Sequence, residues 1–260
     1  RHAMGGQQFG EGTTLVDTRG LSRVLGFDRA RGVLDVEAGI EWPELIAWLD
    51  AAQAGDPAPW GIIQKQTGAD RLTLGGALAA NVHGRGLTLG PIVGDVESFT
   101  IMDATGRVRR CSRGENADLF RLAIGGYGLF GVVTSVRLRL RRKVKVRRVV
   151  ELGDVDGLAA AFEARIAGGY LYGDFQYATD PAGGAFLRRG VFACYRPVAL
   201  ETPLTDCAAG FSPEDWARLL RDAHDDKAAA FDYYSTRYLE TSGQVYWSDA
   251  QLSGEYLDDY

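Results

Sequence analysis

The sequence predicts an α+β fold, and two observations support this class. The spacing of apolar residues changes along the chain between the period of two that is typical of strands and the 3.6-residue period of helices. In the C-terminal half a helix, several strands and a further helix are expected in succession, as in an α+β domain. With 260 residues, of which 46% are hydrophobic, the chain can bury a full core and is long enough for one large domain or two ordinary ones.

Composition limits the classes of partner. The chain has 29 basic and 34 acidic residues, and its formal net charge of −5 argues against nucleic-acid binding, which requires a basic surface. Small molecules are the expected partners. No transmembrane segment is expected, because no apolar run reaches the roughly 18 residues that a membrane helix needs. No signal peptide is visible at Arg1, where the chain is expected to lack its true N-terminus.

The three cysteines are widely spaced and form no C-x-x-C pair: Cys111, Cys194 and Cys207. No histidine lies near them at zinc-ligand spacing, so no metal site is expected. Their odd number and wide spacing fit a reduced protein, and a cytoplasmic location is therefore expected.

The N-terminal third is expected to pass from loop to strands to helix. Residues 1–11 are polar and glycine-rich, and strands are expected at residues 13–17, 24–28 and 32–37. Helical spacing then recurs at Trp42, Leu45, Ile46 and Leu49, with Pro43 suited to a first turn. An amphipathic helix is expected over residues 41–52, followed by a loop over residues 53–71.

A glycine pair, Gly75 and Gly76, lies in the stretch T-L-G-G-A-L-A-A-N-V-H-G-R-G that begins at Thr73. Residues 77–80 are expected to form a short, tightly packed helix. The glycine amides are expected to be free donors at its N-terminus, where such donors bind phosphate. A glycine turn entering a buried helix explains the pair equally well. Further glycines at residues 5–6 and 125–131 favour one extended cofactor that contacts three loops.

The centre of the chain is expected to be largely β. A hairpin is predicted from residues 96–103 and 108–112, then a helix over residues 115–124 capped by Ser112 or Asn116, then a strand over residues 131–140. Residues 126–131 spell G-x-G-x-x-G, the fingerprint of dinucleotide-binding folds. That fingerprint follows a strand and opens a helix, whereas here it follows a helix and enters a strand, so a nicotinamide-binding unit is not expected.

The basic run R-R-K-V-K-V-R-R over residues 141–148 alternates valines with charges. In an acidic protein this pattern favours a strand with one solvated face over a nucleic-acid patch, and it marks a domain boundary. Beyond it, helices are expected at residues 154–166 and 212–222, and strands at residues 170–177, 185–189 and 191–196. Aromatic residues crowd the tail from residue 231 to 260, either as core and surface filling or as the lining of a substrate region.

Four motifs in order carry a family resemblance: residues 72–84 with the glycine pair and His83-Gly84, the hairpin turn D-A-T-G at residues 103–106, D-L-F at residues 118–120, and G-G-Y-G-L-F-G-V-V-T at residues 125–134. Together they resemble the PCMH-type FAD-binding domain of the vanillyl-alcohol-oxidase superfamily. The resemblance covers roughly residues 1–140. Within the superfamily it is strongest to the branch of decaprenylphosphoryl-ribose oxidase and the alditol and sugar-lactone oxidases.

The resemblance implies the domain organisation. Residues 1–142 are expected to form the FAD-binding domain, of two small α+β subdomains, and residues 149–260 a substrate or cap domain with an antiparallel sheet. Both are expected to be incomplete, the first at its N-terminus and the second at its C-terminus, because family members have additional chain at both ends.

The resemblance also implies the cofactor contacts. The pyrophosphate loop matches Arg1, His2, Ala3, Met4, Gly5 and Gly6. Contacts along FAD match Gly68, Ala69, Thr73, Gly75, Gly76, Val82, His83 and Gly84, and the strand beside the adenine matches Val132 and Val133. His2 lies where some relatives bond a histidine covalently to the flavin; otherwise it hydrogen-bonds the loop.

The function implied by the resemblance is oxidation of a hydroxyl-bearing carbon of a sugar, alditol or related alcohol, with hydride transfer to flavin N5. His83 is the expected polar group beside the flavin, and Arg85 is expected to contact the substrate or its phosphate. The electron acceptor is oxygen or another molecule. Two alternatives stay open: a flavin-binding module without turnover, and an NADPH-dependent enolpyruvyl reductase.

Overall fold

The computed structural model describes residues 6, 8–68, 70–205 and 210–250. Within them the chain divides into two compact units. Unit 1 comprises residues up to 84 and residues 90–143, and unit 2 comprises residues 85–89 and residues from 144 onward. Each unit combines helices with an antiparallel sheet, so the predicted α+β class is confirmed.

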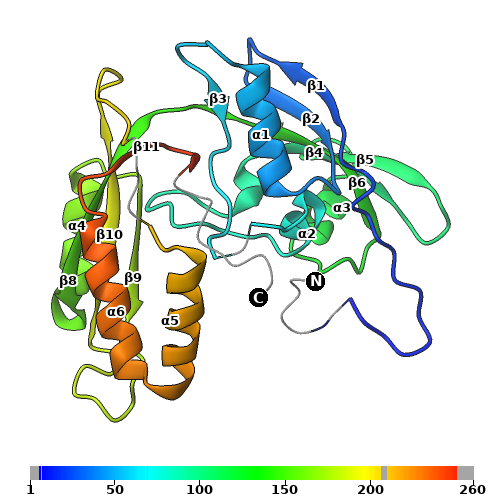
Figure 1. Ribbon diagram of the computed structural model, residues 1–260. Coiled ribbons are helices and arrows are strands. Elements are labelled where there is room, and N and C mark those ends of the chain that lie inside the picture. The colour runs from blue at the N-terminus through cyan, green and yellow to red at the C-terminus, as the bar shows by residue number, and fades with distance from the viewer. Residues whose placement is uncertain (1–5, 7, 69, 206–209, 251–260) are drawn as a thin grey trace. The chain divides into compact units, whose positions relative to one another are not determined.

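Unit 1 is built on a five-stranded sheet with the order β1-β2-β6-β4-β5, in which all neighbours are antiparallel (Figure 1). The strands are β1 Val24–Asp28, β2 Val33–Glu37, β4 Val96–Met102, β5 Val108–Ser112 and β6 Val132–Arg139. Two hairpins, β1-β2 and β4-β5, are joined by β6 between them. Each of these five strands was expected from the sequence within a residue or two.

Three helices complete unit 1: α1 Trp42–Ala52, α2 Leu74–Ala79 and α3 Ala117–Ala123. Glu41 caps α1 through a capping box with Glu44, and Trp42, Leu45 and Leu49 lie on its buried face as the spacing predicts. Short elements fill the remainder: the 3-10 helix Ile92–Gly94 and the paired strands β3 Trp60–Gly61 and β7 Arg141–Arg142. The guanidinium of Arg142 lies 4.0 Å from the ring centre of Trp60.

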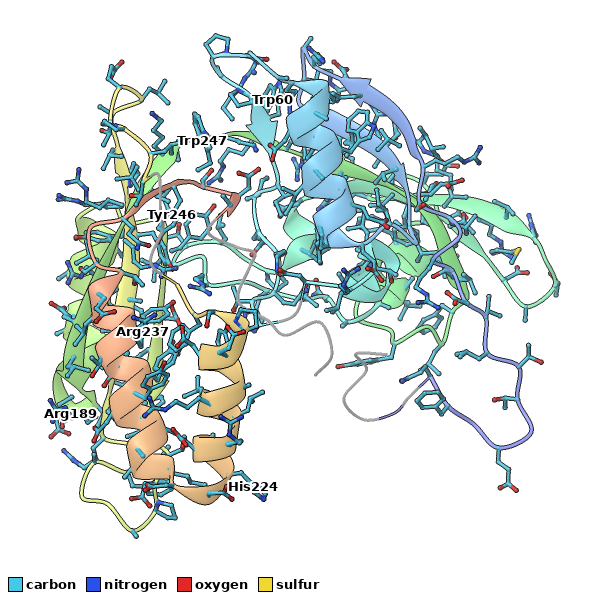
Figure 2. The ribbon with its side chains drawn as sticks, viewed as in Figure 1. Trp60, Arg189, His224, Arg237, Tyr246 and Trp247 are labelled. Carbon is cyan, nitrogen blue, oxygen red and sulfur yellow. The ribbon has the colours of Figure 1, made fainter. Side chains whose placement is uncertain are left out.

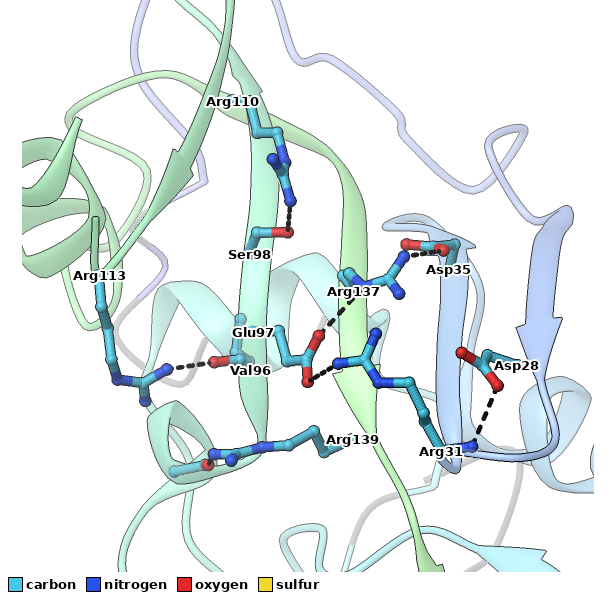
Figure 3. Close-up of polar contacts among 11 residues, drawn as sticks. Asp28, Arg31, Asp35, Val96, Glu97, Ser98, Arg110, Arg113, Arg137 and Arg139 are labelled. Carbon is cyan, nitrogen blue, oxygen red and sulfur yellow. Dashed lines mark hydrogen bonds and ion pairs between the residues drawn. The ribbon is translucent and has the colours of Figure 1, made fainter. Parts of the chain in front are cut away.

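The two faces of this sheet differ in character. Apolar side chains such as Leu34, Phe99 and Val136 are buried in the core. The opposite face carries paired charges: Arg137 lies 2.6 Å from Asp35 and 3.1 Å from Glu97 (Figure 3). A hollow of about 250 Å³ on this face is lined by Asp35 and Arg137, which pair with each other, and by Arg110 and polar residues of β4 and β6.

Unit 2 contains a four-stranded antiparallel sheet with the order β11-β8-β10-β9. Its strands are β8 Lys145–Asp154, β9 Tyr172–Tyr177, β10 Arg189–Val198 and β11 Val245–Trp247. Its helices are α4 Leu158–Ala167, which follows the 3-10 turn Val155–Gly157, α5 Pro213–Asp225 and α6 Lys227–Glu240. One face of the sheet packs Val150, Val191 and Ala193 against Tyr238 of α6.

Helices α5 and α6 pack side by side (Figure 1). Arg237 extends from α6 toward α5, where it lies 3.2 Å from Asp215 (Figure 2). The hydroxyl of Tyr233 donates to the same carboxylate, and this bond holds the pKa of Asp215 down at about 2. Asp215 also forms a capping box with Ser212, which is the predicted N-cap.

Several predicted elements differ from the structure. Residues 13–17 are not a strand, and Leu15 and Val16 are more than half exposed. Residues 185–189 form turns that end in the first residue of β10. The basic run is divided between β7 and β8, and β8 continues to Asp154, so α4 begins four residues later than expected. Helix α6 was missed.

Among the described residues, no helix is both long and apolar enough to cross a membrane. The location of the protein stays a prediction.

Candidate cofactor and substrate site

The entry to α2 is tied to the loop after β2. Leu74 N donates to Ile40 O at 2.9 Å, and Gly75 N donates to Ala38 O at 2.7 Å. Gly76 N donates to the Thr73 hydroxyl at 3.1 Å, because Thr73 is the N-cap. The prediction of free glycine amides that bind phosphate is therefore wrong: neighbouring backbone and the cap already accept from them.

The glycine pair serves two different purposes. A Cβ atom at Gly75 would lie 3.1 Å from Ala38 O and 3.2 Å from Ala38 Cβ, so this glycine allows α2 to approach the loop after β2. A Cβ atom at Gly76 would meet only the Thr73 hydroxyl, at 3.1 Å, and Gly76 is exposed. Gly76 therefore leaves open space beside α2, as a backbone that is approached by a bulky ligand requires.

Two further predicted contacts have backbone conformations that favour glycine. Gly68 has φ of 83° and Gly6 has φ of 68°, and a Cβ atom at either would meet nothing within 4 Å. Outside the described residues lie Arg1, His2, Ala3, Met4, Gly5 and Ala69. The covalent link through His2 therefore stays a prediction.

The turn after α2 presents a histidine to the surface. Val82 N donates to Ala77 O at 3.1 Å, and His83 is exposed. His83 Nδ1 lies 3.1 Å from Gly84 O. Because a carbonyl oxygen only accepts, Nδ1 carries the hydrogen in this contact, and Nε2 is the basic nitrogen of the neutral ring.

The third glycine segment packs against the end of α2. Gly125 N donates to Leu78 O at 3.1 Å and Tyr127 N donates to Ala79 O at 2.9 Å. Two of the three glycine-rich segments therefore meet, as one extended ligand would need. Val132 and Val133 lie in β6, paired with Met102 and Ile101 of β4.

Arg85 belongs to unit 2, where its backbone extends the sheet beside β9. Gly173 N donates to Arg85 O at 2.8 Å. Its guanidinium donates to the hydroxyl of Tyr195 at 2.9 Å and lies 3.6 Å from the carboxylate of Asp174. Only 6% of the side chain is exposed, so β9 and β10 fix this cation in place.

The aromatic tail contributes mainly to the core of unit 2. Tyr238 is buried and stacks on Tyr234, with ring centres 5.0 Å apart. The guanidinium of Arg148 lies 4.9 Å from the ring of Tyr238 and 5.2 Å from that of Tyr246. Core packing accounts for Tyr234 and Tyr238, and Tyr246 is half-buried beside them.

The two described cysteines, Cys111 and Cys194, are free and buried. Burial raises the pKa of both thiols, that of Cys194 to about 12. Neither thiol is exposed to a substrate. Among the described residues no cluster of three metal-ligating side chains occurs.

Comparison with known protein families identifies the N-terminal part. Residues 1–112 match the family described as an FAD binding domain. This part of the chain is similar to FAD-binding domains. The predicted resemblance to FAD-binding oxidoreductases, and the predicted cofactor, are thereby confirmed; the individual contact residues stay predictions.

The relatives include several oxidoreductases. Cytokinin dehydrogenase 7 of Oryza sativa subsp. japonica is 31% identical over 166 residues, which are 60% of this chain and 29% of that protein. L-gulonolactone oxidase of Mus musculus is 32% identical over 120 residues, 46% of this chain and 26% of that protein. Decaprenylphosphoryl-beta-D-ribose oxidase of Mycolicibacterium smegmatis is 28% identical over 149 residues, 56% of this chain and 30% of that protein. The chain thus spans less than a third of the length of these relatives.

A solved structure supports the fold over nearly the whole chain. A solvent-stable cholesterol oxidase superposes with a TM-score of 0.64 and 18% identity, covering 90% of this chain and 48% of that protein. At this identity the similarity concerns the fold, and it confirms the predicted fold class.

One observation bears on whether the segment that matches FAD-binding domains has room for the cofactor. Gly76 and Gly68 are both exposed; a Cβ atom at Gly76 would meet only the capping hydroxyl of Thr73, whereas the φ of 83° at Gly68 by itself favours glycine. These positions, with His83 at the end of the same segment, are the ones predicted to contact FAD.

Proposed function

We propose that this protein is an FAD-dependent oxidoreductase that oxidises a hydroxyl-bearing carbon of a sugar, alditol or related alcohol. The observation that carries the proposal is the family match over residues 1–112, which includes the exposed His83. Two relatives named for a lactone and a ribose derivative, both oxidases, support the substrate class. The relatives named cytokinin dehydrogenase favour a different substrate, and the test below separates the two.

Bound FAD would supply the hydride acceptor, flavin N5. His83 would receive the hydroxyl proton at Nε2, since Nδ1 donates to Gly84 O and holds the ring in that tautomer. Arg85 would orient the substrate through hydroxyl or phosphate oxygens. Its guanidinium is already held by Tyr195 and Asp174, so little side-chain freedom is lost on binding.

The proposal is tested by anaerobic mixing of the full-length protein with alditols, sugar lactones, a cytokinin and NADPH, each alone. Loss of the oxidised flavin absorbance with an alditol or sugar supports it. Loss with the cytokinin alone would assign a different substrate, and loss with NADPH alone would favour a reductase. A flavin that none of them reduces would identify a binding module.

His83→Ala is expected to retain FAD but to slow this reduction by about 10- to 1,000-fold, the range for a positioned base or electrostatic contact. The measurement is the reduction rate in stopped flow. His224, on α5 of unit 2, supplies a control as His224→Ala. Equal rates in the two variants would show that His83 takes no part in the chemistry.

A further inference from the structure

Lys65 is a fully buried lysine in unit 1. None of its side chain is exposed, and its Nζ atom lies 2.6 Å from the carboxylate of Asp70 and 3.0 Å from Gln66 O. Burying an ammonium ion costs free energy, and a buried ion pair is often no more stabilising than apolar side chains of similar volume. Its presence therefore calls for an explanation other than stability.

The ammonium group shapes the loop that leads to α2. Nζ donates to Gln66 O and to the carboxylate of Asp70, one residue on each side of Gly68 in the sequence. Within that segment Thr67 and Gly68 are exposed, and Gly68 has φ of 83°. Lys65 therefore holds residues on both sides of the predicted FAD contact Gly68.

The backbone of Lys65 bears on a second predicted contact. A Cβ atom at Gly84 would lie 2.4 Å from Lys65 O, so the His83-Gly84 turn rests directly on this carbonyl. The neighbouring Gln64 also reaches the turn, since its Oε1 accepts from Gly84 N at 3.5 Å. One short buried segment thus supports both the Gly68 loop and the His83 turn.

We propose that Lys65 is a positioning residue for the FAD site, which fixes Gly68 and His83 relative to each other so that both meet the cofactor. This inference rests on the proposed function. Lys65 itself touches neither cofactor nor substrate; it acts through the loop that its ammonium group closes and the turn that its carbonyl supports. A binding site loses affinity for its ligand when the residues that support its contact residues are displaced.

The test is Lys65→Met in the full-length protein, with Lys143→Met as the matched control. Lys143 is also a buried lysine of unit 1, with 4% of its side chain exposed, and it pairs with Asp50. Lys65→Met is expected to weaken FAD binding by about 10- to 100-fold, the effect of a small misplacement, and to alter the visible circular dichroism of the bound flavin. Lys143→Met is expected to change FAD affinity by less than about threefold.

FAD affinity is measured by fluorescence titration and compared with the thermal midpoint of the apoprotein. A purely structural role would lower the midpoint without selective loss of FAD affinity or change in the flavin spectrum. If Lys65→Met does not fold, Asp70→Asn carries the test, because it removes the carboxylate charge and keeps an acceptor. Affinities equal to that of Lys143→Met would overturn the inference alone, whereas a wild-type protein that binds no FAD would overturn the proposed function as well.

Discussion

At the scale of single residues, adjacent glycines in α2 have separable roles. Gly75 faces the backbone of Ala38, whereas Gly76 faces open space apart from the Thr73 hydroxyl. A side chain at Gly75 would press on backbone atoms and would therefore lower the stability of the folded state. A side chain at Gly76 would occupy space that the predicted FAD site needs.

Gly76→Val is expected to abolish FAD binding while leaving the thermal midpoint of the apoprotein within a few degrees of the wild type, a difference of about 1 kcal/mol or less. Gly75→Ala is expected to lower that midpoint clearly. Flavin absorbance after purification and thermal unfolding measure the two effects. Full FAD occupancy in Gly76→Val would show that the cofactor does not pass in front of this glycine.

Asp95 is expected to make the free energy of unfolding depend on pH. It is 9% exposed, and burial raises its pKa from 3.8 to about 6, against the opposing hydrogen bond from Gln64. The folded state therefore binds this proton more tightly than the unfolded state. The resulting stabilisation is fully present below about pH 4 and is lost as the pH rises through about 6.

Asp95→Asn removes the ionised form that burial disfavours. The variant is expected to be more stable than the wild type at pH 7.5 by about 1 to 3 kcal/mol, and this difference should shrink as the pH falls toward 4. Urea unfolding of both proteins across this range measures it, and taking the difference removes the effects of other carboxylates. A difference independent of pH would mean that Asp95 does not titrate in this window.

At the scale of elements, alternation in the sequence predicted strands that have partners. Five strands were expected from the sequence, and the structure places all of them in one sheet with an apolar face: β1, β2, β4, β5 and β6. Residues 13–17, T-T-L-V-D, are rich in β-branched residues but pair with no described strand, and pairing is a property of the tertiary structure. Helix α6 had a signal that was passed over: Asp226, whose carboxylate accepts from Ala229 N, precedes an alanine run.

In the candidate site, too, some features could be predicted from the sequence and others depend on the tertiary structure. The order of glycine motifs predicted which segments carry FAD, and the family match bears out the cofactor. The prediction of free glycine amides failed because Ala38, far earlier in the chain, accepts from Gly75 N and the Thr73 hydroxyl accepts from Gly76 N. Lys65 was missed because a lone lysine in a polar loop is normally exposed. In the structure its ammonium group is buried against Gln66 O and the carboxylate of Asp70, contacts that the sequence does not reveal.

At the scale of the whole molecule, comparing the effect of FAD on the two units tests which of them binds the cofactor. A ligand that binds only the folded state stabilises it by about 2.7 kcal/mol at 100 times its dissociation constant. If FAD is held by the predicted residues, amide exchange should slow most in α2 and β6 of unit 1. The central strands of unit 2, β8 and β10, should change less.

Hydrogen exchange followed by mass spectrometry, on full-length apoprotein and FAD-loaded protein, measures this pattern. Gly76→Val at the same FAD concentration is the control, and it should show no protection because the cofactor is excluded. Protection confined to β8 and β10 would contradict the assignment, since those strands contain none of the predicted FAD contacts. Protection of α2 together with the segment 125–131 would instead support one ligand that spans both, because Gly125 and Tyr127 are bonded to the end of that helix.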